Sequence, residues 1–107
     1  DADIAACQRI VEGIQTGTVY KPLSKLNTAC IQLAVALAQG KDAKTAIDSS
    51  LGSWTTLNNG TKDVDSFSVD VIAVDKDNMV DVIIKDGFHK LEDVYKNVPK
   101  DQWPKVD

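Results

Sequence analysis

The sequence has few histidines and cysteines, on which many catalytic sites and most zinc sites depend. It contains one histidine, His89, and two cysteines, Cys7 and Cys30. No nucleophile-and-base pattern surrounds His89, so we expect it to cap a helix or face solvent, with a general base as the open alternative. Neither cysteine has a second Cys or a His at zinc-ligand spacing. We therefore expect no catalytic residues, no metal ion and no cofactor.

Long hydrophobic runs and excess positive charge are also missing. No apolar run approaches the roughly 20 residues of a membrane-spanning helix. Twelve Lys and Arg stand against sixteen Asp and Glu, and the net charge of −4 argues against nucleic acid or an anionic membrane as a partner. No phosphate-binding glycine pattern of the Gly-x-Gly-x-x-Gly or Walker type occurs.

What is present suffices for one small domain. The 107 residues are 43% hydrophobic and 26% charged, enough for a core and a solvated surface. The chain opens at Asp1, directly beside a helical pattern and without an initiator Met. We expect it to be a piece of a longer protein, with a mature chain trimmed after its signal peptide as the alternative. Both cysteines lie on apolar stripes, where a free thiol is favoured over a disulfide.

Apolar spacing of three and four predicts two helices in the first forty residues. The first runs from Ile4 to Ile14, with Asp3 as N-cap and Gly13 in the left-handed conformation at its end. A strand over residues 16–20 follows, and Pro22 opens a helix that continues to residue 38. The apolar arc of this second helix is so wide that we expect it to cover a sheet.

The remaining residues alternate between short helical and extended patterns. We expect a helical turn at 43–47, a turn at Asn58-Asn59-Gly60, a strand over 67–74, a helix over 79–84, amphipathic turns at 90–96 and an irregular tail. This alternation predicts the α/β class with largely parallel strand pairing.

One group of acids comes close to the spacing of a calcium loop. Asp75, Asp77 and Asp81 fit that spacing, but Val80 stands where the loop needs glycine and Met79 offers no oxygen ligand. We interpret these acids as a helix cap and surface charges.

Two opposite charges fall at predicted strand ends. Lys21 directly follows the strand over 16–20, and Asp1 precedes the first helix. In an open α/β sheet, ligands bind beyond the carboxyl ends of the strands, so both charges are expected to face one crevice. The alternative from spacing alone is a helix-capping aspartate and a solvated lysine.

Several runs resemble the xylose-binding branch of the type I periplasmic sugar-binding proteins. They are residues 1–5 (DADIA), 7–10 (CQRI), 18–22 (TVYKP), 56–60 (TLNNG), 62–64 (KDV) and 82–90 (VIIKDGFHK), together with Gly13, Gln15 and Thr16. The resemblance extends to about Leu91 and corresponds to the C-terminal third or so of such a protein. Gly17 departs from it, because a larger residue is common there, and we expect this glycine to loosen the strand.

The resemblance implies part of a two-lobed α/β fold, with mostly parallel sheets flanked by helices and a sugar bound between the lobes. Residues 1–21 would form a second-lobe segment ending at a hinge crossing, and 22–68 a first-lobe segment. Residues 69–107 would form a crossing strand, a second-lobe helix and the tail. Asp1 and Lys21 would hydrogen-bond sugar hydroxyls.

The function implied by the resemblance is non-catalytic, extracytoplasmic binding of D-xylose or a related aldose for import by an ABC transporter. Its partners would be the sugar, the ABC permease in the membrane and the N-terminal remainder of the same protein. The location would be the periplasm, or the outer face of the cell membrane with a lipid anchor in Gram-positive bacteria. The alternatives are a sugar sensor signalling to a membrane kinase or regulator, a flavodoxin-like enzyme, and a fragment cleaved by accident.

Overall fold

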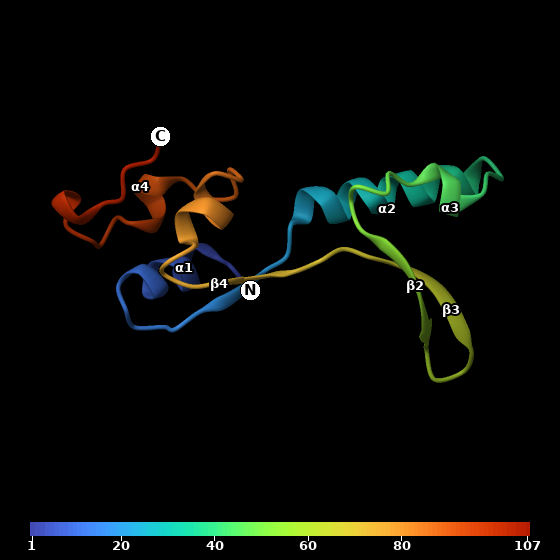
Figure 1. Ribbon diagram of the computed structural model, residues 1–107, viewed down its shortest axis with the longest axis horizontal. Coiled ribbons are helices and arrows are strands. Elements are labelled where there is room, and N and C mark those ends of the chain that lie inside the picture. Colours follow the sequence, from blue (N-terminus) through green and yellow to red (C-terminus); the bar gives the residue numbers. More distant parts are fainter. The chain divides into compact units, whose positions relative to one another are not determined.

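The computed structural model describes all 107 residues, and these form two compact units. Unit 1 comprises residues 1–21 and 71–107, and unit 2 comprises residues 22–70. Figure 1 shows the chain leaving unit 1 after its first strand and returning to it through the strand β4. Unit 1 is therefore assembled from two segments that lie far apart in the sequence.

Unit 1 begins with the helix α1, Ile4–Val11. Its N-cap is Asp3, whose Oδ1 accepts a hydrogen bond from the backbone amide of Ala6 at 2.8 Å. This bond satisfies a free amide of the first turn and lowers the pKa of the Asp3 carboxyl. Gly13 has a φ of 80°, so the predicted cap and the predicted left-handed glycine are both confirmed.

The strand β1, Thr18–Tyr20, pairs antiparallel with β4, Ile72–Val74. It starts two residues later than predicted, and Gly17, directly before it, brings the backbone against the end of β4. A Cβ at Gly17 would lie 2.8 Å from the carbonyl oxygen of Val74, closer than real side chains come. The glycine thus allows a close backbone approach.

The rest of unit 1 consists of short helical segments. They are the π-helix η1, Val80–Ile84, the α-helix α4, Leu91–Val94, and the 3₁₀-helix η2, Lys100–Gln102. The predicted helix over 79–84 is present, but its hydrogen bonding is wider than α-helical, with the Lys85 amide bonded to the Val80 carbonyl at 2.9 Å. The tail, expected to be irregular, contains η2.

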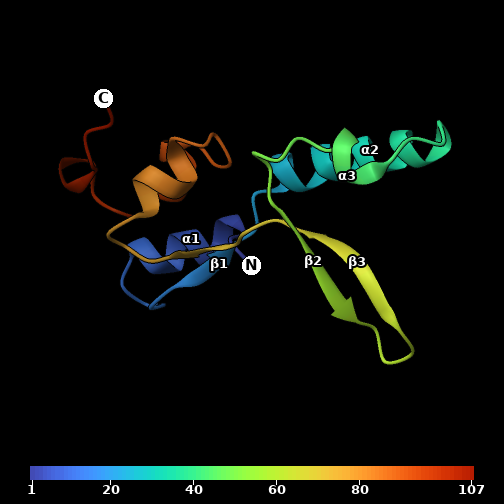
Figure 2. The same ribbon diagram turned by 45° about the vertical axis from the view of Figure 1, so that its right-hand side comes forward.

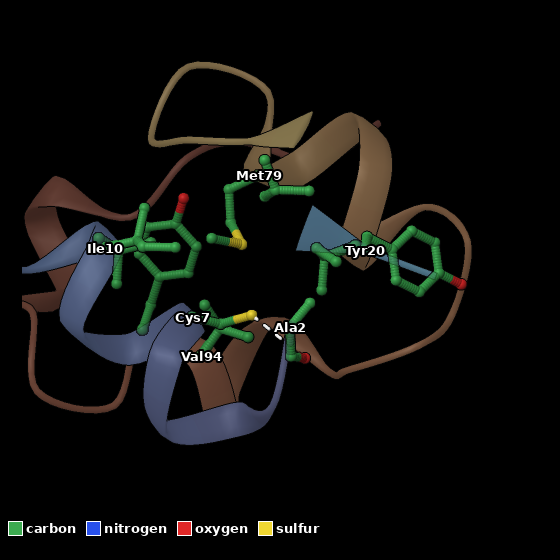
Figure 3. Close-up of a cluster of buried hydrophobic side chains, with 10 residues drawn as sticks. Ala2, Cys7, Ile10, Tyr20, Met79 and Val94 are labelled. Carbon is green, nitrogen blue, oxygen red and sulfur yellow. Dashed lines mark hydrogen bonds between the residues drawn. The ribbon is translucent and has the colours of Figure 1, made fainter. Parts of the chain in front are cut away.

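The core of unit 1 gathers side chains from α1, β1, β4, η1 and α4 (Figure 3). The side chains with less than 2% of their surface exposed are those of Cys7, Ile10, Val74, Met79, Ile83 and Val94. Tyr20 lies at the edge of this cluster, and its ring extends away from the other labelled side chains in Figure 3. Apolar burial from both segments therefore holds unit 1 together.

Unit 2 combines two helices with a hairpin. The helix α2, Leu23–Ala38, packs against the short helix α3, Ala43–Ala46, as Figure 2 also shows. The strands β2, Ser53–Asn58, and β3, Asp63–Ser68, pair antiparallel across the predicted turn, where Gly60 has a φ of 90°. Both helices lie close to their predicted positions.

Three expectations about the strands and α2 are wrong for this chain. Both strand pairs are antiparallel, not parallel: a tight turn joins β2 to β3, and β4 returns along the path by which β1 leaves. The strand predicted over 67–74 is two strands, because β3 ends at Ser68 in unit 2 and β4 begins at Ile72 in unit 1.

The apolar arc of α2 is largely exposed, although it was expected to cover a sheet. Ile31, Val35 and Leu37 expose 65%, 47% and 64% of their surface, and the buried residues of α2 are Ala29 and Ala36. The reason is that α3 and one hairpin supply too little surface to cover so wide an arc.

Candidate functional site

The two charges singled out in the sequence meet in unit 1. Lys21 Nζ lies 2.8 Å from Asp1 Oδ1. Their side chains remain 51% and 70% exposed, respectively, so solvent and small solutes can reach both head groups. The structure thus brings Asp1 and Lys21 together, as the sequence predicted. Lys21 is not a lysine that contacts solvent alone, which was the alternative from spacing.

Local structure places each of these charges. Asp1 stands two residues before the N-cap of α1, and Lys21 directly follows β1, whose last residue Tyr20 is paired with Ile72. Pro22 comes next and fixes the backbone direction at the start of α2. The ion pair therefore sits where the entry to α1 meets the exit from β1.

Because the ion pair is exposed, a polar ligand can replace the contact between Lys21 and Asp1 with hydrogen bonds of its own. Exposed pairs contribute about 0–1 kcal/mol to stability, so separating the two head groups costs little. A carboxylate only accepts hydrogen bonds and an ammonium only donates them, whereas an alcohol does both. One hydroxyl, or two neighbouring ones, can thus satisfy Asp1 and Lys21 at the same time.

Side chains from one loop contact the segments that carry the two charges. His89 Nε2 lies 2.8 Å from the carbonyl oxygen of Ala2, and the Tyr20 hydroxyl donates to Asp86 Oδ2. Burial, followed by the hydrogen bond to Asp86, raises the pKa of Tyr20 to about 12. The Tyr20 hydroxyl is thus held in its neutral, donating form.

Sequence reasoning missed this placement of His89. The histidine is half-buried and bonded to Ala2, and it neither caps α4, whose N-cap is Lys90, nor stands free in solvent. The partners lie 87 residues apart, and no spacing rule relates residues at that separation. The resemblance of residues 82–90 to known relatives was the one signal that pointed to this loop.

The other candidate groups show ordinary structural contacts. Asp75 Oδ1 accepts from the amides of Asp77 and Asn78 at 2.9 and 3.2 Å and so stabilises the turn before η1. The helix cap expected among these acids is absent, because Met79 stands at the N-cap of η1 and no side chain caps it. No group of three or more His, Cys, Asp or Glu side chains is arranged to hold a metal ion. Cys7 and Cys30 are both free thiols. No helix has the length and apolar character needed to cross a bilayer.

Comparisons with known proteins connect this chain to sugar-binding proteins. Over 95 residues it is 47% identical to a D-xylose-binding periplasmic protein of Haemophilus influenzae, covering 89% of this chain and 26% of that protein. It is also 47% identical over 90 residues to the protein of the same name from Escherichia coli, covering 84% and 25%. The multiple sugar-binding periplasmic receptor ChvE of Rhizobium radiobacter is 28% identical over 92 residues. No protein-family model matches the chain.

Solved structures give the same picture. A carbohydrate transporter solute-binding protein from Chloroflexus aurantiacus, in complex with D-glucose, superposes with a TM-score of 0.74 at 33% identity, covering 87% of this chain and 25% of that one. An ABC transporter solute-binding protein from Clostridium phytofermentans, with bound β-D-glucose, shares the fold with a TM-score of 0.72 at 20% identity.

These findings confirm the resemblance and the α/β fold class inferred from the sequence. The chain is similar to a C-terminal part of the D-xylose-binding periplasmic proteins. It spans about a quarter of the length of the curated relatives that it matches.

Proposed function

We propose that this chain is the C-terminal portion of an extracytoplasmic sugar-binding protein that delivers D-xylose or a related aldose to an ABC transporter. The observation that carries the proposal is the pairing of Lys21 Nζ with Asp1 Oδ1 at 2.8 Å, in a chain 47% identical to D-xylose-binding periplasmic proteins. Residues 1–21 and 69–107 would belong to one lobe of the complete protein and residues 22–68 to the other. Its partners would be the sugar, the membrane permease and the preceding part of the same protein.

The proposed chemistry is binding without bond breaking. Asp1 would accept from one or two adjacent sugar hydroxyls, and Lys21 would donate to one or two. Hydrogen bonds to charged groups contribute about 1.5–3 kcal/mol each when shielded from water. An aldose with the wrong hydroxyl configuration would leave one of these charges without a partner, which provides selectivity. Closure of the two lobes over the sugar would be the state that the permease recognises.

Titration calorimetry on the complete protein that carries this chain tests the proposal. Asp1→Ala and Lys21→Ala are expected to weaken D-xylose binding about tenfold to several hundredfold, because each removes one charged hydrogen-bond partner. The recovered sugar is expected to be chemically unchanged. If the wild-type protein binds neither D-xylose nor D-glucose, or if both variants bind as tightly as the wild type, the proposal is wrong.

A second ion pair in unit 1 provides a matched control. Lys85 Nζ lies 2.7 Å from Asp81 Oδ1, and these side chains are 53% and 68% exposed, nearly the same as in the proposed site. Asp81→Ala removes an equally exposed carboxylate from an equally close pair. This variant is expected to bind the sugar as tightly as the wild type, so that a loss confined to Asp1 and Lys21 cannot be ascribed to surface charge in general.

A further inference from the structure

Four consecutive residues, Asp86 to His89, contact the two segments that carry the proposed sugar-binding charges. One segment begins with Asp1, and the other is the strand β1, which ends directly before Lys21. This loop, called here the 86–89 loop, follows η1 and precedes α4. Gly87 has a φ of 73°, and nothing lies within 4 Å of the position of its missing Cβ, so the backbone conformation and not space favours glycine here. The turn at Gly87 lets Asp86 and His89 contact different parts of unit 1.

The first connection runs from His89 to the segment that carries Asp1. His89 Nε2 lies 2.8 Å from the carbonyl oxygen of Ala2, which only accepts hydrogen bonds. Nε2 must therefore carry the proton and donate it. Ala2 is 4% exposed, and its carbonyl is also approached by Cys7 Sγ at 3.7 Å. The peptide unit that links Ala2 to Asp3, one residue beyond Asp1, is thus fixed against the core.

The second connection runs from Asp86 to the strand that ends before Lys21. Tyr20 is 3% exposed, and its hydroxyl donates to Asp86 Oδ2. Phe88 lies between the two connections, with its ring centroid 4.9 Å from that of Tyr20 and 4.4 Å from that of His89. The loop is therefore one packed element that touches Tyr20 at one end and Ala2 at the other.

We propose that the 86–89 loop is a positioning element for sugar binding: His89 and Asp86 set the placement of Asp1 and Lys21 by holding the residues next to them, Ala2 and Tyr20. This inference rests on the proposed function. His89 is a positioning residue that does not touch the sugar, because its Nε2 is already committed to Ala2. A measurable effect on sugar affinity is expected because each anchored residue is the direct neighbour of a charge.

Substitutions at His89 separate the hydrogen bond from simple packing. The side-chain amide nitrogen of glutamine reaches about where Nε2 of histidine lies, whereas that of asparagine falls near Nδ1. In the complete protein, His89→Asn and His89→Leu are expected to weaken D-xylose binding about three- to tenfold, and His89→Gln is expected to restore most of the affinity. At the other end of the loop, Asp86→Leu is expected to weaken binding, and Asp86→Asn, which keeps an acceptor for the Tyr20 hydroxyl, is expected to retain it.

Combining substitutions distinguishes positioning from a general loss of fold. In an Asp1→Ala background, His89→Leu is expected to weaken binding less than twofold further, because the charge that it places is gone. Nitrogen NMR of the sugar-free wild-type protein is expected to show His89 protonated at Nε2. Equal losses for His89→Leu with and without Asp1 would overturn the positioning role, as would a His89 bearing its proton on Nδ1 alone.

The outcomes keep this inference separate from the proposed function. If Lys21→Ala and Asp1→Ala lose D-xylose while His89→Leu and His89→Asn bind like the wild type, the positioning role is wrong and the sugar site stands. If the wild type binds neither D-xylose nor D-glucose, the sugar site is wrong, and the positioning role for sugar binding falls with it.

Discussion

Lys21 Nζ and Asp1 Oδ1 lie 2.8 Å apart, although twenty positions of sequence and the whole of α1 and β1 separate the two residues. The contact is made at the surface, since half or more of each side chain is exposed. It joins the entry of one helix to the exit of one strand within unit 1. A close pair of opposite charges in so exposed a place contributes little to folding.

The first prediction follows from this exposure. Lys21→Met in the 107-residue chain is expected to change the free energy of unfolding by less than about 1 kcal/mol, because exposed ion pairs contribute little. Urea unfolding followed by circular dichroism measures the change, with Lys85→Met as the matched control. A destabilisation of about 3 kcal/mol or more would show that the pair is structural.

The second prediction concerns the titration of Tyr20. Its pKa is raised to about 12 by burial and by the hydrogen bond to Asp86, whereas an unperturbed tyrosine titrates near pH 10. The folded state therefore favours the neutral phenol, a stabilisation that is complete below pH 10 and is lost as the pH rises from 10 towards 12. Ultraviolet absorbance of phenolate against pH is expected to show one tyrosine ionising near pH 12.

Two variants assign that titration. Tyr20→Phe is expected to remove the step near pH 12, and Asp86→Leu is expected to lower its midpoint, since the acceptor and the negative charge are both removed. Burial also raises the pKa of Tyr95, so the assignment depends on the Tyr20→Phe comparison. A step near pH 12 that persists in Tyr20→Phe would contradict the prediction.

The third prediction concerns the approach of β1 to β4. Gly17→Ala is expected to destabilise unit 1 by about 1–3 kcal/mol, because a Cβ would stand 2.8 Å from the Val74 carbonyl oxygen and the backbone must move. Urea unfolding detected by Trp103 fluorescence in a Trp54→Phe background reports on unit 1, which contains Trp103.

Gly13→Asn is the control for Gly17→Ala. Gly13 has a φ of 80° with nothing within 4 Å of a Cβ, and asparagine tolerates the left-handed region better than most residues. Its cost is expected to be well below that of Gly17→Ala. Equal stability of Gly17→Ala and the wild type would show that the strands can separate without loss.

The fourth prediction distinguishes the two thiols. Cys7 is 0% exposed, and burial raises its pKa, whereas Cys30 is exposed on α2. Because the thiolate is the reactive form, a disulfide reagent is expected to label one thiol quickly in the folded 107-residue chain and the second only in denaturant. Cys30→Ser is expected to abolish the fast phase, and Cys7→Ser to leave it intact. Two fast thiols in the folded chain would contradict the burial of Cys7.

The sequence by itself predicted the local features of this protein. The N-cap at Asp3, the left-handed Gly13, the extent of α2 and the turn at Gly60 all depend on interactions within a few residues, and all are found. Such features follow from which side chains can satisfy a free amide or adopt a positive φ, and these properties are written in the residue types themselves. The resemblance to sugar-binding proteins was also present in the sequence alone.

Only the tertiary structure decided which distant segments meet. The antiparallel pairing of β1 with β4, the exposure of the apolar arc of α2 and the bond from His89 to Ala2 depend on how the chain returns to unit 1 after unit 2. Residue spacing placed Asp1 and Lys21 at strand and helix ends, but the distance between them is set by the shared core beneath α1 and β1. Contacts between residues far apart in sequence depend on how apolar side chains are buried in the whole unit, and local sequence patterns do not predict them.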